Sequence, residues 1–394
     1  MKDSIYFDNA ATTPVAPLVI KVINTYFTDK FANPSSLHQE GQKALRGVEE
    51  ARGRIAKFLG AKKEEIVFTS GATESNNIAI QGLARALRKK GGKHVITSSV
   101  EHPAVLETCR SLKKEGLRVT ELPVNHWGMV GVPDFKRAIT NDTFLVTIMY
   151  INNEVGTIEP ISEIGSFLQR INRKRKRKIY FHTDAVQAIS LLPCQVNELK
   201  VDLLSLSGHK IYGPKGVGAL YIRKGTPLIP IQSGGHHEKG IRPGTINAPL
   251  IAGLGRAIEL VERNQKKDFV KLKKLSDKII NYVLKNIPRS YFNGHRLKRS
   301  PAHINLTFEN VEGESLLMML DMKGISVSTG SACASGTLEP SPVLRAMGLS
   351  HEMCHGSIRI SLGRHNTLKE VNYFLEILPK LVKKIRERSP LKPL

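Results

Sequence analysis

The sequence lacks any long apolar run. None of its 394 residues belongs to a stretch approaching the roughly 18 apolar residues that a membrane-spanning helix needs. The first residues, Met1 to Phe7, have neither the apolar region nor the small-residue cleavage site of a secretory signal peptide. We therefore expect a cytoplasmic protein without a membrane partner.

Cysteine is also scarce. The four cysteines are Cys109, Cys194, Cys333 and Cys354, and no two of them form a C-x-x-C pair. The spacing thus gives no signal for a zinc site or a paired redox motif, and we predict no metal site. We interpret three of the four as small, partly buried apolar side chains that stay reduced in the cytosol. Cys333 differs, because it lies among small residues that predict a mobile loop.

Acidic residues are few relative to basic ones. The 59 Lys and Arg against 35 Asp and Glu give a net charge of +24, which attracts anions without specifying a fold. The most concentrated basic block is Arg173–Lys178. One interpretation is a solvated loop between a helix and a strand; the other is a weak RNA contact through phosphates. No aromatic residue interrupts the block, so it predicts no platform for base stacking.

The sequence does contain a regular alternation of apolar strands and amphipathic helices between about residues 60 and 225. Short strands that are almost entirely apolar predict an α/β fold with a mostly parallel sheet buried on both faces by helices. A long helical stretch and a smaller α+β pattern follow. We predict a large cofactor-binding domain over residues 16–257, and a small domain over residues 1–15 and 258–394 that carries the Cys333 loop.

Polar motifs stand at the ends of five predicted strands. Because the carboxyl ends of parallel strands meet at one edge of a sheet, we expect these motifs to form a ligand site there. The motifs are Ser70-Gly71-Ala72-Thr73, Glu101-His102, Asn152-Asn153-Glu154, His182-Thr183-Asp184 and Ser207-Gly208-His209-Lys210.

These residue types meet the needs of pyridoxal phosphate. Lys210 can hold the aldehyde as a Schiff base, and the backbone before the helix at Thr73 can cradle the phosphate. Asp184 can pair with the pyridine nitrogen, and Gln187 can reach the phenolic oxygen. His102 can stack on the ring. Ser207 and His209, which flank Lys210, can also bind the phosphate.

Each residue taken alone has a purely structural interpretation. The Thr73 segment can be an ordinary helix cap, and Asp184 a cap or turn residue. His102 can be a satisfied structural histidine, and Lys210 one more surface lysine among many. Their occurrence together, at equivalent strand ends, favours the cofactor site.

The order of the motifs resembles that of the NifS/IscS cysteine desulfurases, which are fold-type-I enzymes of the class-V aminotransferase type. The resemblance covers nearly the whole chain. The matching segments are Tyr6–Pro14, Thr69–Asn77, Ser207–Gly216, Gly330–Cys333 and Leu338–Leu344. Many ordered matches are a far more specific signal than a lone motif.

The resemblance implies a seven-stranded sheet, pyridoxal 5'-phosphate as cofactor, and a role for each matching residue. Cys333 is the implied nucleophile, and Lys210 and His102 are the other catalytic residues. The implied cofactor-binding residues are Lys210, Ala72, Thr73, His102, Asp184, Gln187, Ser207, His209 and Thr245. Asn153 and Arg359 are implied to bind the substrate carboxylate. Thr245 is implied to reach the phosphate of a neighbouring subunit, which makes the protein a homodimer.

The implied reaction converts L-cysteine to L-alanine and leaves a persulfide on Cys333. The sulfur then passes to an acceptor protein, for iron–sulfur cluster assembly or tRNA thiolation. Two alternatives stay open at this point. One is a selenocysteine lyase or another pyridoxal-phosphate enzyme on the same scaffold. The other is a basic RNA-binding protein with a vestigial site, which the complete set of cofactor residues disfavours.

Overall fold

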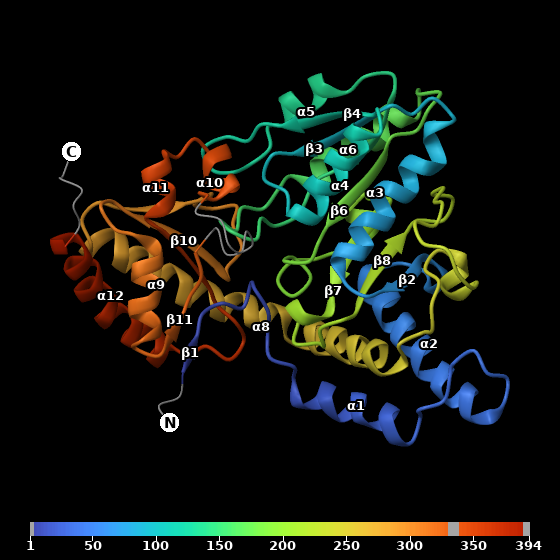
Figure 1. The fold of residues 1–394 in the computed structure, drawn as a ribbon, viewed down its shortest axis with the longest axis horizontal. Coiled ribbons are helices and arrows are strands. Elements are labelled where there is room, and N and C mark those ends of the chain that lie inside the picture. The colour runs from blue at the N-terminus through green and yellow to red at the C-terminus, as the bar shows by residue number, and fades with distance from the viewer. Residues whose placement is uncertain (1–3, 330–338, 389–394) are drawn as a thin grey trace.

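The computed structural model describes residues 4–329 and 339–388, in which a large sheet lies beside two small ones (Figure 1). Among the described residues, no helix is long and apolar enough to cross a membrane. The strands predicted between about residues 60 and 225 are present. In spatial order the large sheet consists of β2 (Ile66–Thr69), β8 (Gly218–Ile222), β7 (Leu203–Ser207), β6 (Tyr180–Asp184), β5 (Thr143–Thr147), β3 (His94–Ser98) and β4 (Arg118–Leu122).

Six of these seven strands run in one direction, which confirms the predicted α/β fold with a mostly parallel sheet. The exception is β8, which is antiparallel to both of its neighbours. Only the short 3-10 turn η2 (Gly208–Lys210) and the segment Ile211–Val217 connect β7 to β8. A parallel crossover needs about a dozen residues or more, so this connection allows only an antiparallel return.

Helices cover both faces of the large sheet. Consecutive strand residues supply two separate apolar clusters: Leu145 and Leu203 belong to one, whereas Val146 and Leu204 belong to the other. This alternation explains why the strands read as continuous apolar runs. The covering helices are α3 (Ala72–Arg88) and α4 (Pro103–Lys114) on one face, and α1 (Pro17–Thr28), α2 (Gln39–Leu59), α5 (Val132–Ala138), α6 (Ile161–Asn172) and α7 (Val196–Leu199) on the other.

The smaller part of the molecule has a core of its own. Its elements are the antiparallel sheet β12 (Ser357–Ser361), β10 (His303–Phe308) and β9 (Ser290–Asn293), the parallel pair β1 (Ile5–Tyr6) and β11 (Ile325–Ser326), and the helices α9 (Gly313–Asp321), α10 (Pro342–Ala346), α11 (His351–His355) and α12 (Leu368–Arg388).

The long helix α8 (Ala248–Asn286) joins the two cores. Its residues from Ile251 to Val261 pack in the core of the large sheet, and those from Leu272 to Val283 pack in the smaller core. The predicted domain boundary after residue 257 lies inside this helix and stays a prediction.

A buried ion pair fixes the outer edge of the large sheet. Arg52 of α2 donates to both carboxylate oxygens of Glu238, at 2.9 and 2.8 Å, and also to the carbonyl oxygen of Ile66. Glu238, in the 3-10 turn η3 (His237–Gly240), accepts from the backbone N–H of Phe68 at 2.8 Å. Because β2 is an edge strand, this carboxylate replaces the missing neighbouring strand. The pair thereby holds β2 where it leads into Ser70 and Gly71.

We predict that Glu238→Ala lowers the free energy of unfolding by about 3–5 kcal/mol, because it leaves the buried Arg52 charge without its buried partner. Arg52 also pairs with the more exposed Glu49 at 2.9 Å, which gives a matched control. Glu49→Ala should cost less than about 1 kcal/mol. Chemical denaturation of the cofactor-free variants measures both. Equal effects of the two substitutions would contradict the role given to the buried pair.

Candidate active site

A cavity of about 800 Å³ lies at the carboxyl ends of the parallel strands, between the large sheet and the smaller part of the molecule. The structure thus brings together the polar motifs predicted at the strand ends. Of the predicted site residues, those that line the cavity are Ala72, Thr73, His102, Asn153, Asp184, Gln187, Ser207, His209, Lys210 and Arg359.

Lys210 ends the short turn η2, directly after β7. Its Nζ donates to the carbonyl oxygen of Ala11 at 2.8 Å and also to that of Ala10. The amide of Gln187 donates to the same Ala10 oxygen at 3.1 Å. The amine is therefore held at the cavity wall by the N-terminal segment of the chain.

Asp184 occupies the last position of β6 and is held at both carboxylate oxygens. Oδ1 accepts from the backbone N–H of Val186 at 3.0 Å, and Oδ2 accepts from the side-chain amide of Asn76 at 2.7 Å. Asn76 lies on α3 and is fully buried. Sequence analysis did not single out Asn76, although it lies inside the matching segment Thr69–Asn77. The contact turns the Asp184 carboxylate into a fixed hydrogen-bond acceptor in the cavity.

The start of α3 forms one wall of the cavity. Gly71 precedes the helix with φ of 157°, and a Cβ at Gly218 would lie 2.8 Å from the Gly71 backbone, so the glycine at 218 allows the close approach of β8 here. The N-terminus of this long helix offers backbone N–H groups beside the Thr73 hydroxyl. Burial lowers the pKa of His209, which also lines the cavity, to about 4, and the positive charges of Lys210 and Lys215 act in the same direction. His209 is therefore neutral near pH 7 and donates or accepts without adding charge.

His102 is the N-cap of α4, and its Nδ1 accepts from the backbone N–H of Ala104 at 3.1 Å. Burial lowers the pKa of His102, against the raising effect of Asp184, and Lys210 lowers it further. A neutral ring with an occupied Nδ1 carries its proton on Nε2. The capping interaction and the predicted role in the cavity therefore coexist in one side chain.

Arg359 on β12 brings a buried positive charge to the far side of the cavity. Its Nη2 donates to Asp8 Oδ1 at 2.9 Å, and Nη1 donates to the carbonyl oxygen of Asn153 at 3.3 Å. Nε is buried and has no acceptor among the described residues. An arginine N–H that is out of contact with water and still unused suits a carboxylate ligand.

Glu154 is a buried carboxylate that sequence analysis placed in a motif but gave no role. Burial raises its pKa to about 7, although a hydrogen bond from Ser341 and the nearby Arg359 oppose this shift. Ser341 also caps α10 by accepting from the backbone N–H of Leu344. The contact therefore ties the start of α10 to the segment that carries Asn153.

Among the described residues, one predicted site residue is not part of this cavity. Thr245 lines a neighbouring pocket that shares Ser70 and Gly216 with the main cavity. Cys333 lies outside the described residues. The chain before it reaches the cavity at Ser328, whose backbone forms hydrogen bonds with Arg359 in both directions.

The other three cysteines are buried free thiols, as predicted. Burial raises the pKa of Cys354 to about 11 and raises the pKa of both Cys109 and Cys194 further. None of these three thiols is therefore ionised near pH 7, and each behaves as an apolar side chain.

Comparison with known families and proteins agrees with this site. Residues 5–374 match the model of the family Aminotransferase class-V. The cysteine desulfurase IscS of Dictyoglomus turgidum is 50% identical over 392 residues, which cover 100% of this chain and 98% of that protein. The cysteine desulfurase of Mus musculus is 46% identical over 98% of this chain and 83% of its own length.

Solved structures give the same result. A NifS-like protein superposes with a TM-score of 0.89 at 37% identity, covering 97% of this chain and 100% of its own. SspA in complex with cysteine superposes with a TM-score of 0.80 at 39% identity, covering 92% of this chain and 100% of its own. Sequence, fold and site therefore agree that this chain belongs to the aminotransferase class-V family, and within it to the cysteine desulfurases.

Proposed function

We propose that the chain removes sulfur from L-cysteine, releasing L-alanine and leaving a persulfide on Cys333. The observation that carries this proposal is the arrangement of one cavity. Lys210, Asp184 and the start of α3 lie on its large-sheet side, and the Arg359 guanidinium faces them from the small sheet. Such a cavity suits a ligand with an anionic phosphate at one end and an amino-acid carboxylate at the other.

The residues present fit pyridoxal phosphate, on which the enzymes of this family depend. We assign the phosphate to Ala72, Thr73, Ser207 and His209, and the pyridine nitrogen to Asp184. When bound, this cofactor supplies an aldehyde that captures amines and a ring that accepts electrons from the captured substrate.

We assign to His102 the face of the cofactor ring, and to Gln187 the phenolic oxygen. The orphaned Asn76 Oδ1 and Arg359 Nε, both buried and without partners in the described part of the chain, support a polar ligand in this cavity.

Residues of this chain then bind the substrate, accept its Cα proton and remove its sulfur. Arg359 and Asn153 hold the carboxylate of L-cysteine, which orients the Cα–H bond toward Lys210. The Lys210 Nζ accepts the Cα proton. The Cys333 thiolate attacks the substrate sulfur, a new S–S bond forms, and the C–S bond breaks with its electron pair left on the carbon. Protonation of that side-chain carbon, and return of a proton to Cα, give alanine.

We further propose that an acceptor protein takes the persulfide sulfur, for iron–sulfur cluster assembly or tRNA thiolation. The name IscS among the relatives supports the former. A cytoplasmic location stays a prediction.

A homodimer is also part of the proposal, and the surface of α1 supports it. Leu18, Ile20 and Phe27 on this helix are between 45% and 65% exposed, and Phe31, just after the helix, is 70% exposed. Several exposed apolar side chains of this size on one short segment are typical of an interaction surface. Thr245, whose pocket borders the main cavity, is then available to the phosphate bound in the neighbouring subunit.

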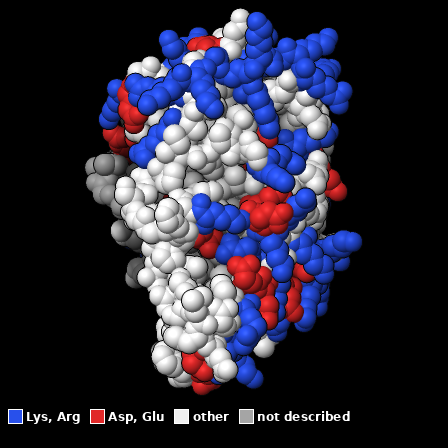
Figure 2. All heavy atoms as spheres, turned by 90° about the vertical axis from the view of Figure 1, so that its right-hand side faces the viewer, with Lys and Arg blue, Asp and Glu red and all other residues white. Residues whose placement is uncertain are grey.

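A weak RNA contact through the basic block is a lesser proposal. Lys and Arg gather at the top of the face in Figure 2, and the block precedes β6 at the upper right in Figure 1. The block is a loop between α6 and β6, as predicted, but part of it contacts the rest of the protein. Arg175 and Arg177 donate to carbonyl oxygens of neighbouring loops, and Lys178 pairs with Asp202 at 2.7 Å. Arg173, Lys174 and Lys176 are exposed and available to phosphates.

The Cys333→Ala variant should bind the cofactor normally, judged by its visible absorption, and should form no persulfide. In a single-turnover incubation with L-cysteine, we expect the wild type to give alanine and a Cys333 peptide heavier by one sulfur. The Cys333→Ala variant should give neither product. Cys354→Ala is the matched control, because that thiol is buried and un-ionised, and it should react like the wild type. Normal sulfide release by Cys333→Ala would refute the proposed nucleophile.

Replacing Phe27 and Phe31 together by Lys should convert the dimer to a monomer, because the charges cannot be buried in an apolar interface. Sedimentation velocity measures the change. The control replaces Leu297 and Met322 by Lys, since these side chains are at least as exposed but lie in the smaller part of the molecule. A wild-type protein that sediments as a monomer would refute the proposal.

Replacing Arg173, Lys174 and Lys176 by Ser should weaken tRNA binding and lower its salt dependence. Loss of three phosphate contacts reduces the slope of log affinity against log salt by about 2–3. Replacing Lys266 and Lys267, two exposed lysines on α8, by Ser is the control and should have a smaller effect. Unchanged affinity and slope in the triple variant would remove the proposed contact.

A further inference from the structure

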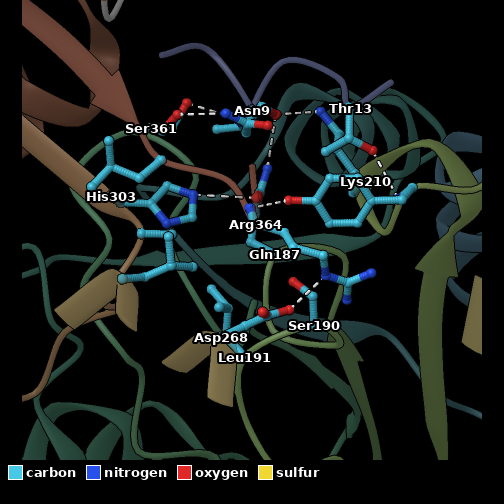
Figure 3. Close-up of a pocket in the computed structure, with 15 residues that line it drawn as sticks. Asn9, Thr13, Gln187, Ser190, Leu191, Lys210, Asp268, His303, Ser361 and Arg364 are labelled. Carbon is cyan, nitrogen blue, oxygen red and sulfur yellow. Dashed lines mark hydrogen bonds and ion pairs between the residues drawn. The ribbon is translucent and has the colours of Figure 1, made fainter. Parts of the chain in front are cut away.

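Gln187 is held from behind by a buried histidine of the smaller part of the molecule. His303 is the first residue of β10 and is 2% exposed. Its Nε2 lies 3.2 Å from Gln187 Oε1, across the narrow pocket drawn in Figure 3. The two residues are separated by 116 positions in the sequence, and none of the roles assigned above involves His303.

The direction of each hydrogen bond in this contact follows from the groups at its two ends. The carbonyl oxygen of Ala10 can only accept, so the Gln187 nitrogen must face it. The Gln187 oxygen then faces His303, which must donate from Nε2. At the other end, Ser300 Oγ accepts from the backbone N–H of Ala302 at 3.2 Å, and it lies 2.7 Å from His303 Nδ1. With the proton of a neutral ring on Nε2, Nδ1 can only accept, so the Ser300 hydroxyl donates its hydrogen to Nδ1.

The charges around His303 keep this arrangement in place. Burial lowers its pKa to about 3, and Arg359 on β12 and Lys210 on η2 lower it in the same direction. The ring is therefore neutral, with one N–H, throughout the physiological range. Gly156 packs closely against the base of the His303 side chain, because a Cβ at Gly156 would lie 2.6 Å from the Cβ of His303.

The consequence concerns the second N–H of the Gln187 amide. One of its two hydrogens goes to Ala10, and the other remains for a group in the cavity that Gln187 lines. A flipped amide would instead present an oxygen, which would repel a negatively charged ligand atom. Ala10 and His303 together exclude this alternative: the Ala10 carbonyl oxygen can only accept, and a His303 ring that accepts from Ser300 at Nδ1 donates from Nε2.

We propose that His303 is a positioning residue for the cofactor: it holds the Gln187 amide so that an N–H, and not the oxygen, faces the phenolic oxygen of pyridoxal phosphate. This rests on the proposed function, since it requires that cofactor in the cavity with Gln187 beside its phenolic oxygen. A hydrogen bond donated to this oxygen stabilises its negative charge. With the cofactor held by Lys210, the phenolic oxygen and the Lys210 nitrogen would share one proton. A hydrogen bond from Gln187 to this oxygen would lower the affinity for that proton.

The test is a pH titration of the visible absorption of the reconstituted holoenzyme, without substrate. His303→Phe keeps the ring volume and removes the donor. We expect the midpoint of the spectral transition to rise by about one pH unit, the size associated with one hydrogen bond to a charged group. His303→Gln, which places an amide N–H near the position of Nε2, should restore most of the wild-type midpoint.

Two further variants complete the design. Ser300→Ala leaves the ring in place but frees Nδ1, and it should give a smaller rise of the same sign. It also keeps the proposal testable if His303→Phe does not fold. His365→Phe is the matched control, because His365 is exposed and contacts Tyr212 instead of Gln187. Its midpoint should equal that of the wild type.

The outcomes separate this proposal from the function on which it rests. Suppose that His303→Phe and Ser300→Ala both bind the cofactor, still form a persulfide on Cys333, and titrate with the wild-type midpoint. That result would overturn the role of His303 and leave the proposed function intact. A wild-type protein that binds no pyridoxal phosphate would overturn both. A raised midpoint in His303→Phe that His303→Gln reverses supports the proposal, because a merely structural defect would not be rescued by restoring one N–H.

Discussion

The active-site cavity depends on a short N-terminal segment, residues 8–13, that is hydrogen-bonded to both parts of the molecule. On one side, the backbone N–H of Ala10 donates to Ser361 on β12 at 2.8 Å. On the other side, the backbone N–H of Thr13 donates to the carbonyl oxygen of His209 at 2.9 Å. Between these anchors, the carbonyl oxygen of Ala10 accepts from Lys210 and Gln187. The segment therefore sets the distance between the proposed catalytic amine and the small sheet that carries Arg359.

The same segment explains how the molecule carries a buried arginine at a site that must bind an anion. Arg359 would be costly to bury alone, and Asp8 supplies one partner while the Asn153 carbonyl supplies another. Asp8 compensates the positive charge of Arg359, but the Nε–H of the guanidinium has no acceptor among the described residues. A carboxylate ligand then completes an incomplete set of hydrogen bonds, which is a more favourable change than the displacement of an existing set.

Local patterns made the fold and most of the cavity predictable from the sequence. Strands buried on both faces must be continuous apolar runs, and their polar ends must meet at one edge, so Thr73, Asp184 and Lys210 were found by position alone. The contacts made by Asn76 and His303 leave no such trace. Asn76 bonds to a residue 108 positions away, and His303 to one 116 positions away, so their partners depend on packing between distant elements. The direction of β8 was likewise decided by the length of a connection and not by its apolar pattern.

The basic composition illustrates why charge counts alone say little about a binding surface. Several basic side chains are used inside the fold: Arg52 holds an edge strand, and Arg175 binds the carbonyl oxygens of Thr140 and Asn141. The block that contains Arg175 precedes β6, whereas the cavity lies where β6 ends at Asp184. A polyanion bound at the block would therefore lie at the opposite edge of the sheet from the cavity. It would not compete with an amino acid for the cavity, and its effect on the reaction would have to come through the field of the protein or through a partner that spans both edges.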